Sequence, residues 1–242
     1  MKQVIIYNQL NTEYHGGKRY IDDELQKFLQ CQIDISLHLG WNPKDIILGT
    51  NFEFKYKGVN SHILTDICQW SGFNNFWFGA IELLERGVIT EDFWLHDHDS
   101  WPIQKFQFPK FEGEIAGCEY IGTTEWNCAS IYCKKSSLEI LQYIKDVLSV
   151  NKDVNLSSDE VFIAFLRKNP NSPIKQYMTS INTRYNVGVT HGKLRLSAAI
   201  KPVNVLSFNP GVEIGISRLK EQELIHEIPP DLLTIFNKYF TI

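Results

Sequence analysis

Two kinds of hydrophobic pattern alternate along the first hundred residues. Short apolar runs, typical of buried strands, occupy residues 4–7, 45–49 and 92–95. Between them, apolar residues recur at mostly helical spacing over residues 21–39 and 76–85. Strands joined by helices favour parallel pairing. The connection between two parallel strands must return to the end of the sheet where the first strand began, and it usually does so as a helix. The pattern predicts a parallel sheet whose third strand ends at residue 95.

Helix ends are marked by residues suited to them. Asp22 and Asp23 stand in the first turn of the first helix, where the helix dipole favours negative charge. Gly40 and Arg86-Gly87 follow the two helices and are expected to end them. The other expected elements are an extension of the second strand at 52–56, strands at 120–122 and 129–133, helices at 136–148 and 159–167, strand and loop from 181 onward, and a final helix at 230–239.

Length and composition fit one α/β domain. The chain has 242 residues, of which 43% are hydrophobic and 21% charged, an ordinary balance for a globular fold. No linker, repeat or low-complexity segment marks a boundary. We therefore expect a single domain over residues 1–242, with a mixed, mostly parallel sheet flanked by helices.

Charge and cysteine usage narrow the functional classes. The net charge of -4 argues against binding nucleic acid through a broad basic face. Five cysteines without a CxxC pair indicate neither a disulfide framework nor a zinc site, so we expect buried thiols in a reducing compartment. The amino terminus resembles no signal peptide and no stretch is long enough to span a membrane, so we expect a cytoplasmic protein.

The segment Phe93-Trp94-Leu95-His96-Asp97-His98-Asp99 carries the strongest chemical signal. In an extended backbone, Asp97 and Asp99 leave the same face and can converge on one cation. Hard carboxylate oxygens suit Mg²⁺ or Mn²⁺, which can also hold a diphosphate and stabilise it as a leaving group. The alternative is a polar turn after a strand.

This segment, placed after two strand–helix units, resembles the DxD motif of nucleotide-sugar glycosyltransferases with the glycosyltransferase-A fold. The likeness covers the order of elements from about Val4 to Arg167. It implies a Rossmann-like domain with a nucleotide-binding half at about 1–100 and an acceptor-binding half at about 101–242. By resemblance, Asp97 contacts the donor's ribose or sugar, and Asp99 binds the metal that holds the donor diphosphate.

The resemblance also implies a downstream metal ligand. His191, set between small residues, is the best candidate, although an exposed loop histidine fits the sequence equally. The family's usual His followed by Lys-Pro-Trp is only faintly echoed by Lys201-Pro202-Val203.

Asp159 and Glu160 are the candidate catalytic residues. In inverting members of the family, an acid in this part of the chain takes a proton from the acceptor hydroxyl. Acids at the start of a helix are also favoured by capping and by the dipole whatever the function.

The tip of the first strand is where the family cradles the nucleotide. By that resemblance we expect Tyr7, Asn8 and Asn11 to contact base and ribose, and Lys18 and Arg19 to neutralise phosphate. A solvated basic turn explains Lys18 and Arg19 equally well.

Trp126 and Asn127 are the candidate sugar- or acceptor-binding pair. An indole face beside an amide suits the apolar face and the hydroxyls of a sugar. The alternative is a tryptophan packed in the core.

Two other functions remain open. The cluster from His96 to Asp99 could serve a metal-dependent hydrolase or nuclease, although alternation would turn the histidines away from the aspartates. A nucleotide-binding protein of the same fold without activity is the second alternative. For a transferase, the acceptor could be a glycan, a protein, a small molecule or modified DNA, the last through Lys105, Lys110, Lys134 and Lys135.

Overall fold

The computed structural model describes residues 1–8, 22–66, 74–120, 126–150, 169, 171–189, 196–208 and 211–242, with only the backbone for 22–25. Several predicted features lie outside these ranges: Asn11, Lys18, Arg19, Asp159, Glu160, His191 and the helix at 159–167.

The centre of the structure is a parallel ladder. β1 (Lys2–Tyr7) pairs in parallel with β2 (Ile46–Thr50) on one side and with β5 (Phe93–His96) on the other. Alternate residues of β1 reach opposite faces, so Val4 and Ile6 join one hydrophobic cluster while Ile5 joins another. Both faces are therefore buried, which explains why these strands are apolar runs. The predicted parallel pairing is confirmed.

A hairpin extends the sheet beyond β2. β4 (Val59–Ile63) pairs in parallel with β2, and β3 (Lys55–Tyr56) pairs antiparallel with β4. The prediction that residues 52–56 extend the second strand is wrong. Lys57 and Gly58 both have positive φ, 45° and 84°, and this tight turn folds the chain back into β4, which the sequence analysis missed.

The other half of the sheet is largely antiparallel. β8 (Trp126–Cys133) runs antiparallel to β5 and to β7 (Ile115–Glu119), and β9 (Met178–Ile181) pairs in parallel with β7. Of the strand expected at 120–122, Tyr120 follows β7, which ends at Glu119, and residues 121–122 lie outside the described residues. In the described chain the strand order is β3-β4-β2-β1-β5-β8-β7-β9.

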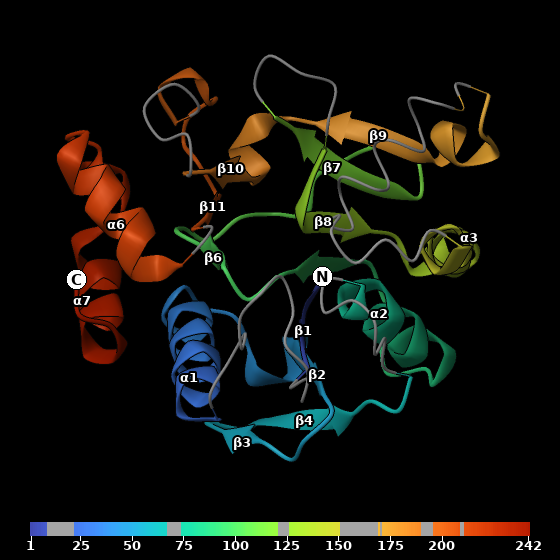
Figure 1. Ribbon diagram of the computed structural model, residues 1–242, viewed down its shortest axis with the longest axis horizontal. Coiled ribbons are helices and arrows are strands. Elements are labelled where there is room, and N and C mark those ends of the chain that lie inside the picture. The colour runs from blue at the N-terminus through green and yellow to red at the C-terminus, as the bar shows by residue number, and fades with distance from the viewer. Residues whose placement is uncertain are drawn as a thin grey trace.

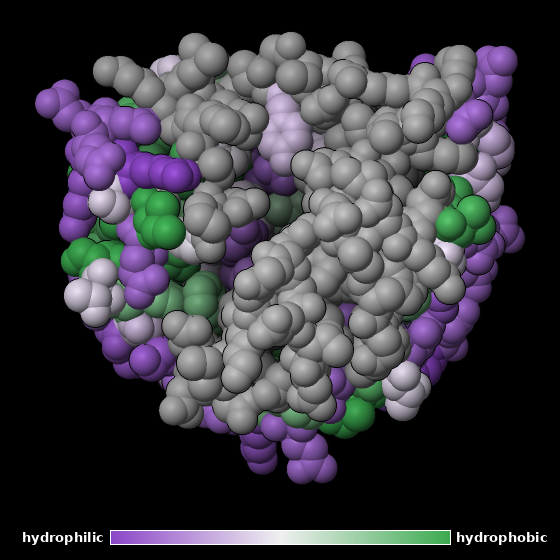
Figure 2. Space-filling view, in the orientation of Figure 1, coloured by the Kyte–Doolittle hydropathy of each residue, from purple (hydrophilic) through white to green (hydrophobic). Residues whose placement is uncertain are grey.

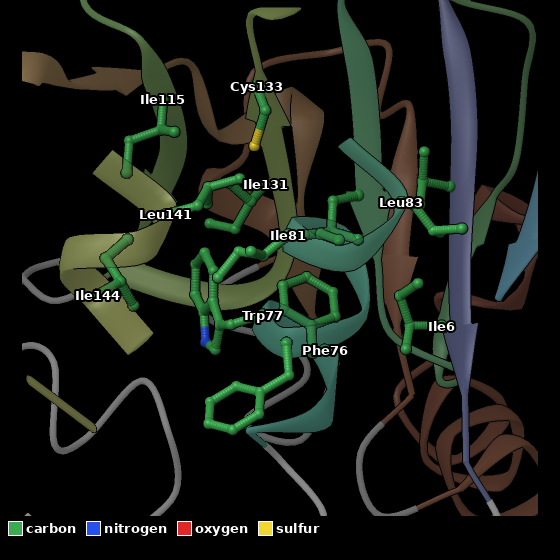
Figure 3. Packing of buried hydrophobic residues seen from close by; sticks show 14 of the residues in the cluster. Ile6, Phe76, Trp77, Ile81, Leu83, Ile115, Ile131, Cys133, Leu141 and Ile144 are labelled. Carbon is green, nitrogen blue, oxygen red and sulfur yellow. The ribbon is translucent and has the colours of Figure 1, made fainter. Parts of the chain in front are cut away.

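Helices cover both faces of the sheet (Figure 1). α1 (Asp22–His38) packs on the face that carries Ile5, whereas α2 (Asn75–Glu85) and α3 (Leu138–Val150) pack on the opposite face. Figure 3 shows Trp77 of α2 between α3 and the sheet. α2 approaches β1 closely at Gly79, where an added Cβ would lie 2.8 Å from Ile6 Cγ2.

A smaller sheet carries the carboxyl-terminal part. Its strands are β10 (Val187–Gly188), β11 (Val205–Ser207) and β6 (Ser100–Pro102), in that order. α6 (Val212–Glu221) and α7 (Pro230–Tyr239) pack beside it. α7 matches the prediction, but α6 was expected to be strand or loop. Short 3-10 turns complete the fold: η1 (Pro43–Asp45), η2 (Lys135–Ser137), η3 (Pro173–Tyr177), η4 (Thr183–Tyr185) and η5 (Ile225–Glu227).

A polar network ties α7 to α1. Asp34, 8% exposed, accepts hydrogen bonds from Lys57 Nζ at 2.6 Å, Tyr239 Oη at 2.7 Å and Lys238 Nζ at 3.1 Å. Burial raises the pKa of this carboxyl, but the three hydrogen bonds outweigh burial and hold the pKa below its usual value. The network therefore anchors α7 to α1.

The predicted fold class is confirmed: a mixed α/β sheet flanked by helices. The described cysteines, Cys31, Cys118, Cys128 and Cys133, are buried free thiols, as expected. Among the described helices, none combines the length and the apolar character that crossing a membrane requires.

Candidate functional site

The acidic segment lies where the parallel strands end. β5 ends at His96, and the next residues form a turn in which Ser100 N donates to Asp97 O at 3.2 Å. The expected extended backbone from Asp97 to Asp99 is therefore wrong, because the chain bends here to start β6. The position at the carboxyl edge of the parallel strands, where α/β folds bind ligands, is as predicted.

Asp97 is held by the residue that follows it. Its Oδ1 accepts from His98 N at 2.7 Å and contacts His98 Nδ1 at 2.6 Å. The turn brings these side chains together, so the expectation that the histidines face away from the aspartates is wrong for His98. The ring of His98 also contacts Tyr7, with ring centroids 5.5 Å apart. Asp97 is thereby oriented before any ligand arrives.

Gln32 of α1 fixes the backbone of the turn. Its Nε2 lies 3.2 Å from Asp97 O, 3.0 Å from His98 O and 3.4 Å from Ser100 O. Gln32 is fully buried, so these carbonyls have a partner where water is excluded. One helix side chain therefore sets the shape of the whole acidic turn.

His96 supports the turn from inside the core. Its Nδ1 donates to Asp97 O at 3.1 Å, Nε2 accepts from Gln3 Nε2 at 2.9 Å, and the ring stacks on Trp94. Burial lowers the pKa of His96 to about 4. His96 is neutral with both nitrogens engaged, which removes it from any set of metal ligands.

Asp99 lies at the junction of the two sheets. It is 7% exposed, and its carbonyl accepts from Phe208 N at 2.8 Å. Val189 N donates to Ser207 O at 3.0 Å, so the ends of β10 and β11 lie side by side next to Asp99. His191, two residues past Val189, lies outside the described residues.

The described residues offer an incomplete metal site. Asp97 and Asp99 supply carboxylates of the kind that Mg²⁺ and Mn²⁺ prefer. Within the described ranges, no group of three or more His, Cys, Asp and Glu side chains is placed to hold a metal. A metal held here would need further oxygens from a bound diphosphate or a ligand such as His191.

Tyr7 and Asn8 occupy the predicted strand tip. Tyr7 is only 3% exposed and packs into the α1 side of the sheet, so its ring supports His98 and offers no open face to a base. The side-chain amide atoms of Asn8 are buried, and no residue of the described chain hydrogen-bonds to them. Asn8 therefore keeps polar atoms available for a ligand.

A bulge in β8 shapes the other side of the site. Gly117 is paired with Ile131, but the next residue, Cys118, is paired with Asn127, so residues 128–130 of β8 have no partner on β7. Asn127 Oδ1 accepts from Ala129 N at 3.0 Å, and Ala129 O accepts from Asp97 N at 2.9 Å. The bulge thus places Asn127 beside the acidic turn, as is common next to active sites.

Trp126 lies in the core. It is 5% exposed, and its ring covers Gly117, where an added Cβ would lie 2.4 Å from Trp126 Cε3. Its Nε1 donates to Ser180 Oγ at 3.1 Å. These contacts favour the core interpretation of Trp126 over the sugar-stacking one.

A buried series of hydrogen bonds, which no sequence pattern predicts, joins the acidic turn to the region of the β8 bulge. Ser100 Oγ contacts Ser207 Oγ at 2.8 Å, and Ser207 Oγ donates to Asn186 Oδ1 at 2.7 Å. Asn186 Nδ2 lies 3.5 Å from Asn127 O, a weak contact. Asn186 precedes the short apolar run of β10, but no local pattern shows that it reaches Ser207 or Asn127.

Figure 2 shows a hollow near the middle of the face, with hydrophilic side chains visible inside it.

Solved structures with a similar fold are glycosyltransferases. The chain aligns with a glycosyltransferase involved in glycosylation of the major capsid of PBCV-1, with TM-score 0.55 and 11% identity over 93% of this chain and 100% of that one. It also aligns with the galactosyltransferase LgtC, with TM-score 0.52 and 11% identity over 97% and 100% of the two chains. For GlyE of Streptococcus pneumoniae TIGR4 the TM-score is 0.56 and the identity 11%, over 99% of this chain but 63% of GlyE.

At these identities the likeness shows the fold, and the chain has the glycosyltransferase-A fold. No family model matches the sequence. No curated protein matches it either.

Proposed function

We propose that this protein is a glycosyltransferase that moves a sugar from a nucleoside-diphosphate sugar to an acceptor hydroxyl with the help of Mn²⁺ or Mg²⁺. The observation that carries the proposal is the acidic turn from Asp97 to Ser100 at the carboxyl edge of the parallel strands, held by Gln32 and His98. The proposal is supported by the function of the structural neighbours. LgtC was solved in complex with donor and acceptor sugar analogs.

The two aspartates of the turn have different proposed tasks. Asp99 binds the metal together with His191, and Asp97 orients the donor. The bound metal supplies positive charge to a leaving diphosphate. Because Gln32 and His98 already fix the turn, the protein reorganises little when charge develops, which is how preorganised sites gain rate.

The remaining assignments follow from position in the chain. Asn8 contacts the nucleotide with Asn11, and Lys18 and Arg19 neutralise phosphate. Asn127 binds the transferred sugar or the acceptor. Asp159 or Glu160 accepts the proton of the acceptor hydroxyl if the reaction inverts configuration.

The hydrolase alternative is less favoured. A hydrolytic metal site would use His96 and His98 with the aspartates, but both nitrogens of His96 are engaged in the core and His98 Nδ1 is engaged by Asp97. An inactive nucleotide-binding protein of the same fold is an outcome of the test below.

The test is a thermal-shift panel of nucleoside diphosphates and nucleotide sugars, with and without Mn²⁺. A ligand of the native state raises the melting temperature, by an amount set by its concentration relative to Kd. We expect one nucleotide to stabilise the wild-type protein only with Mn²⁺, and Asp99→Asn to lose at least about 100-fold in affinity, the loss of a charged contact. Asp146→Asn, an exposed aspartate on α3, is the matched control.

Binding must then be linked to transfer. Release of nucleoside diphosphate from the stabilising donor should require Mn²⁺ and fail in Asp99→Asn. Binding without release would favour the inactive nucleotide-binding protein, and a panel without any Mn²⁺-dependent shift would refute the donor site.

A further inference from the structure

The start of α2 lies at the carboxyl edge of the parallel strands. An added Cβ on Gly79 would lie 2.8 Å from Ile6 Cγ2, so this part of α2 packs on β1 one residue before β1 ends. The other end of α2 leads to the start of β5, so α2 runs back along the sheet. In Figure 3, Phe76 and Ile6 lie below Leu83. Asn74, five residues before Gly79, therefore lies about 7.5 Å beyond this contact, toward the edge that carries the acidic turn.

The side-chain amide of Asn74 is buried with an unmet acceptor. Asn74 is 3% exposed, and no residue of the described chain donates a hydrogen bond to its Oδ1. A capping side chain normally bonds the N–H groups of the first turn from an extended backbone. Asn74 has φ -71° and ψ -18°, a helical conformation, and its side chain makes no capping bond. The unmet acceptor therefore costs stability in the free protein.

Backbone donors lie beside this acceptor. Trp77 N and Phe78 N both donate to Asn74 O at 3.1 Å, whereas Phe76 N donates to none of the described residues. The helix dipole adds partial positive charge at this end, and no acidic side chain stands in the first turn. Side chains of a helix lean toward its amino terminus, so the Asn74 amide leans toward the same edge as these donors. The start of α2 therefore presents both an acceptor and a donor.

We propose that Asn74 and the first turn of α2 bind a hydroxyl group of the nucleotide sugar. A hydroxyl can donate to Asn74 Oδ1 and accept from a backbone N–H at the same time, so one group satisfies both. A diphosphate oxygen, although helix starts often bind phosphate, carries no hydrogen at neutral pH and leaves Oδ1 unmet. The inference rests on the proposed function, because the site shares its edge of the sheet with Asp97 and Asp99. Asn74 becomes a specificity-determining residue for that reaction.

The test measures two quantities on Asn74→Leu, which keeps the branched shape of the side chain without its polar atoms. Removing the unmet acceptor should raise the melting temperature of the free protein by about 2–4 °C. Losing the hydrogen bond of the ligand should weaken Mn²⁺-dependent binding of the stabilising nucleotide sugar about tenfold. A side chain that only packs in the fold would not yield a more stable protein that binds more weakly. Asn74→Ala, which adds no volume, repeats the binding measurement.

Ser36→Ala is the matched control. Ser36 is fully buried on α1, and its Oγ has no hydrogen-bond partner among the described residues. The end of α1 leads into the start of β2 through a short turn, so Ser36 lies toward the amino edge of the sheet. This change should also raise the melting temperature, but it should leave nucleotide binding as it is in the wild-type protein.

Two further ligands identify the source of the hydroxyl. Weaker binding of the nucleotide sugar alone by Asn74→Leu assigns the hydroxyl to the transferred sugar. Weaker binding of the nucleoside diphosphate as well, matched by weak wild-type binding of its 2′-deoxy analogue, assigns it to the ribose.

Two results would overturn the inference while the proposed function stands: both Asn74 variants bind the nucleotide sugar as tightly as the wild-type protein, or both lose stability and affinity together. A wild-type protein that binds no nucleotide overturns the proposed function and this inference with it.

Discussion

The two sides of the candidate site are held in different ways. On the side of the acidic turn, partners from within the protein hold the backbone and the Asp97 carboxylate: Gln32 contacts the carbonyls of Asp97 and His98, His98 contacts the Asp97 carboxylate, and His96 contacts the Asp97 carbonyl. On the side of the β8 bulge, Asn127 and Glu119 are each held through one oxygen: Asn127 Oδ1 accepts from Ala129 N, and Glu119 Oε1 accepts from Ser180 Oγ. The acidic turn is therefore the more tightly held of the two sides.

The largest expected effect comes from removing the support of the turn. Gln32→Leu leaves buried carbonyls of Asp97 and His98 without a donor, at roughly 1–3 kcal/mol each, so we expect a loss of about 3 kcal/mol in the free energy of unfolding. Urea unfolding measures this loss, and Mn²⁺-dependent nucleotide binding should weaken with it.

Gln30→Leu is the matched control for that change. Gln30 lies two residues earlier on α1 and is half-buried, and its substitution should change stability by less than about 0.5 kcal/mol. Equal losses in the two variants would mean that Gln32 does no more than fill space.

The second-largest expected loss of stability comes from breaking the hydrogen bond between Ser207 and Asn186, which links the acidic turn to the β8 bulge. Asn186→Ala removes the acceptor of Ser207 Oγ in a buried site, and we expect a loss of about 2 kcal/mol. A double-mutant cycle with Ser207→Ala measures the coupling, which should be about 1 kcal/mol for residues in one hydrogen-bonded chain. Additive losses would show that the two side chains act independently.

The smallest effect should come from outside both sides. Asp34→Asn weakens the network with Lys57 and Tyr239, and we expect a loss of about 1 kcal/mol at neutral pH with unchanged nucleotide binding. Because the folded-state pKa of Asp34 is lowered, its stabilisation is present above the usual value of 3.8 and is lost as the pH falls through the folded-state pKa.

Urea unfolding at pH 7, 5 and 3 checks that sign. The difference between the wild-type protein and Asp34→Asn should stay constant from pH 7 to 5 and shrink at pH 3. A difference that grows on acidification would contradict the lowered pKa.

The sequence predicted the parts of the fold that depend on local pattern. The apolar runs of β1, β2 and β5 could be recognised because strands buried on both faces are uniformly hydrophobic. The hairpin of β3 and β4 was missed because its turn uses Lys57 at positive φ, a conformation unusual for lysine. α6 was missed because Gly215 interrupts the pattern. The glycine is required there because an added Cβ would lie 2.5 Å from Phe208 Cδ1.

The candidate site shows the same limit. The position of the acidic segment at the end of β5 could be predicted from the order of strands and helices along the chain. The bend of the backbone after His96 could not. It depends on Gln32, which is remote in sequence and whose donors meet the turn only after α1 has packed. The pairing of Asn186 with Ser207 likewise depends on contacts between segments that no periodicity reveals.

The bulge of β8 makes the pairing of this strand depend more on the number of residues between Asn127 and Ile131 than on their identity. The three extra residues between Asn127 and Ile131 let the Ala129 carbonyl meet Asp97 while β8 stays paired with β7. Substitution at Cys128 keeps that spacing. A one-residue deletion would move Asn127 out of register and exchange the faces of Trp126 and Asn127. We therefore expect descendants of this sequence to vary in side chains here while keeping the residue count.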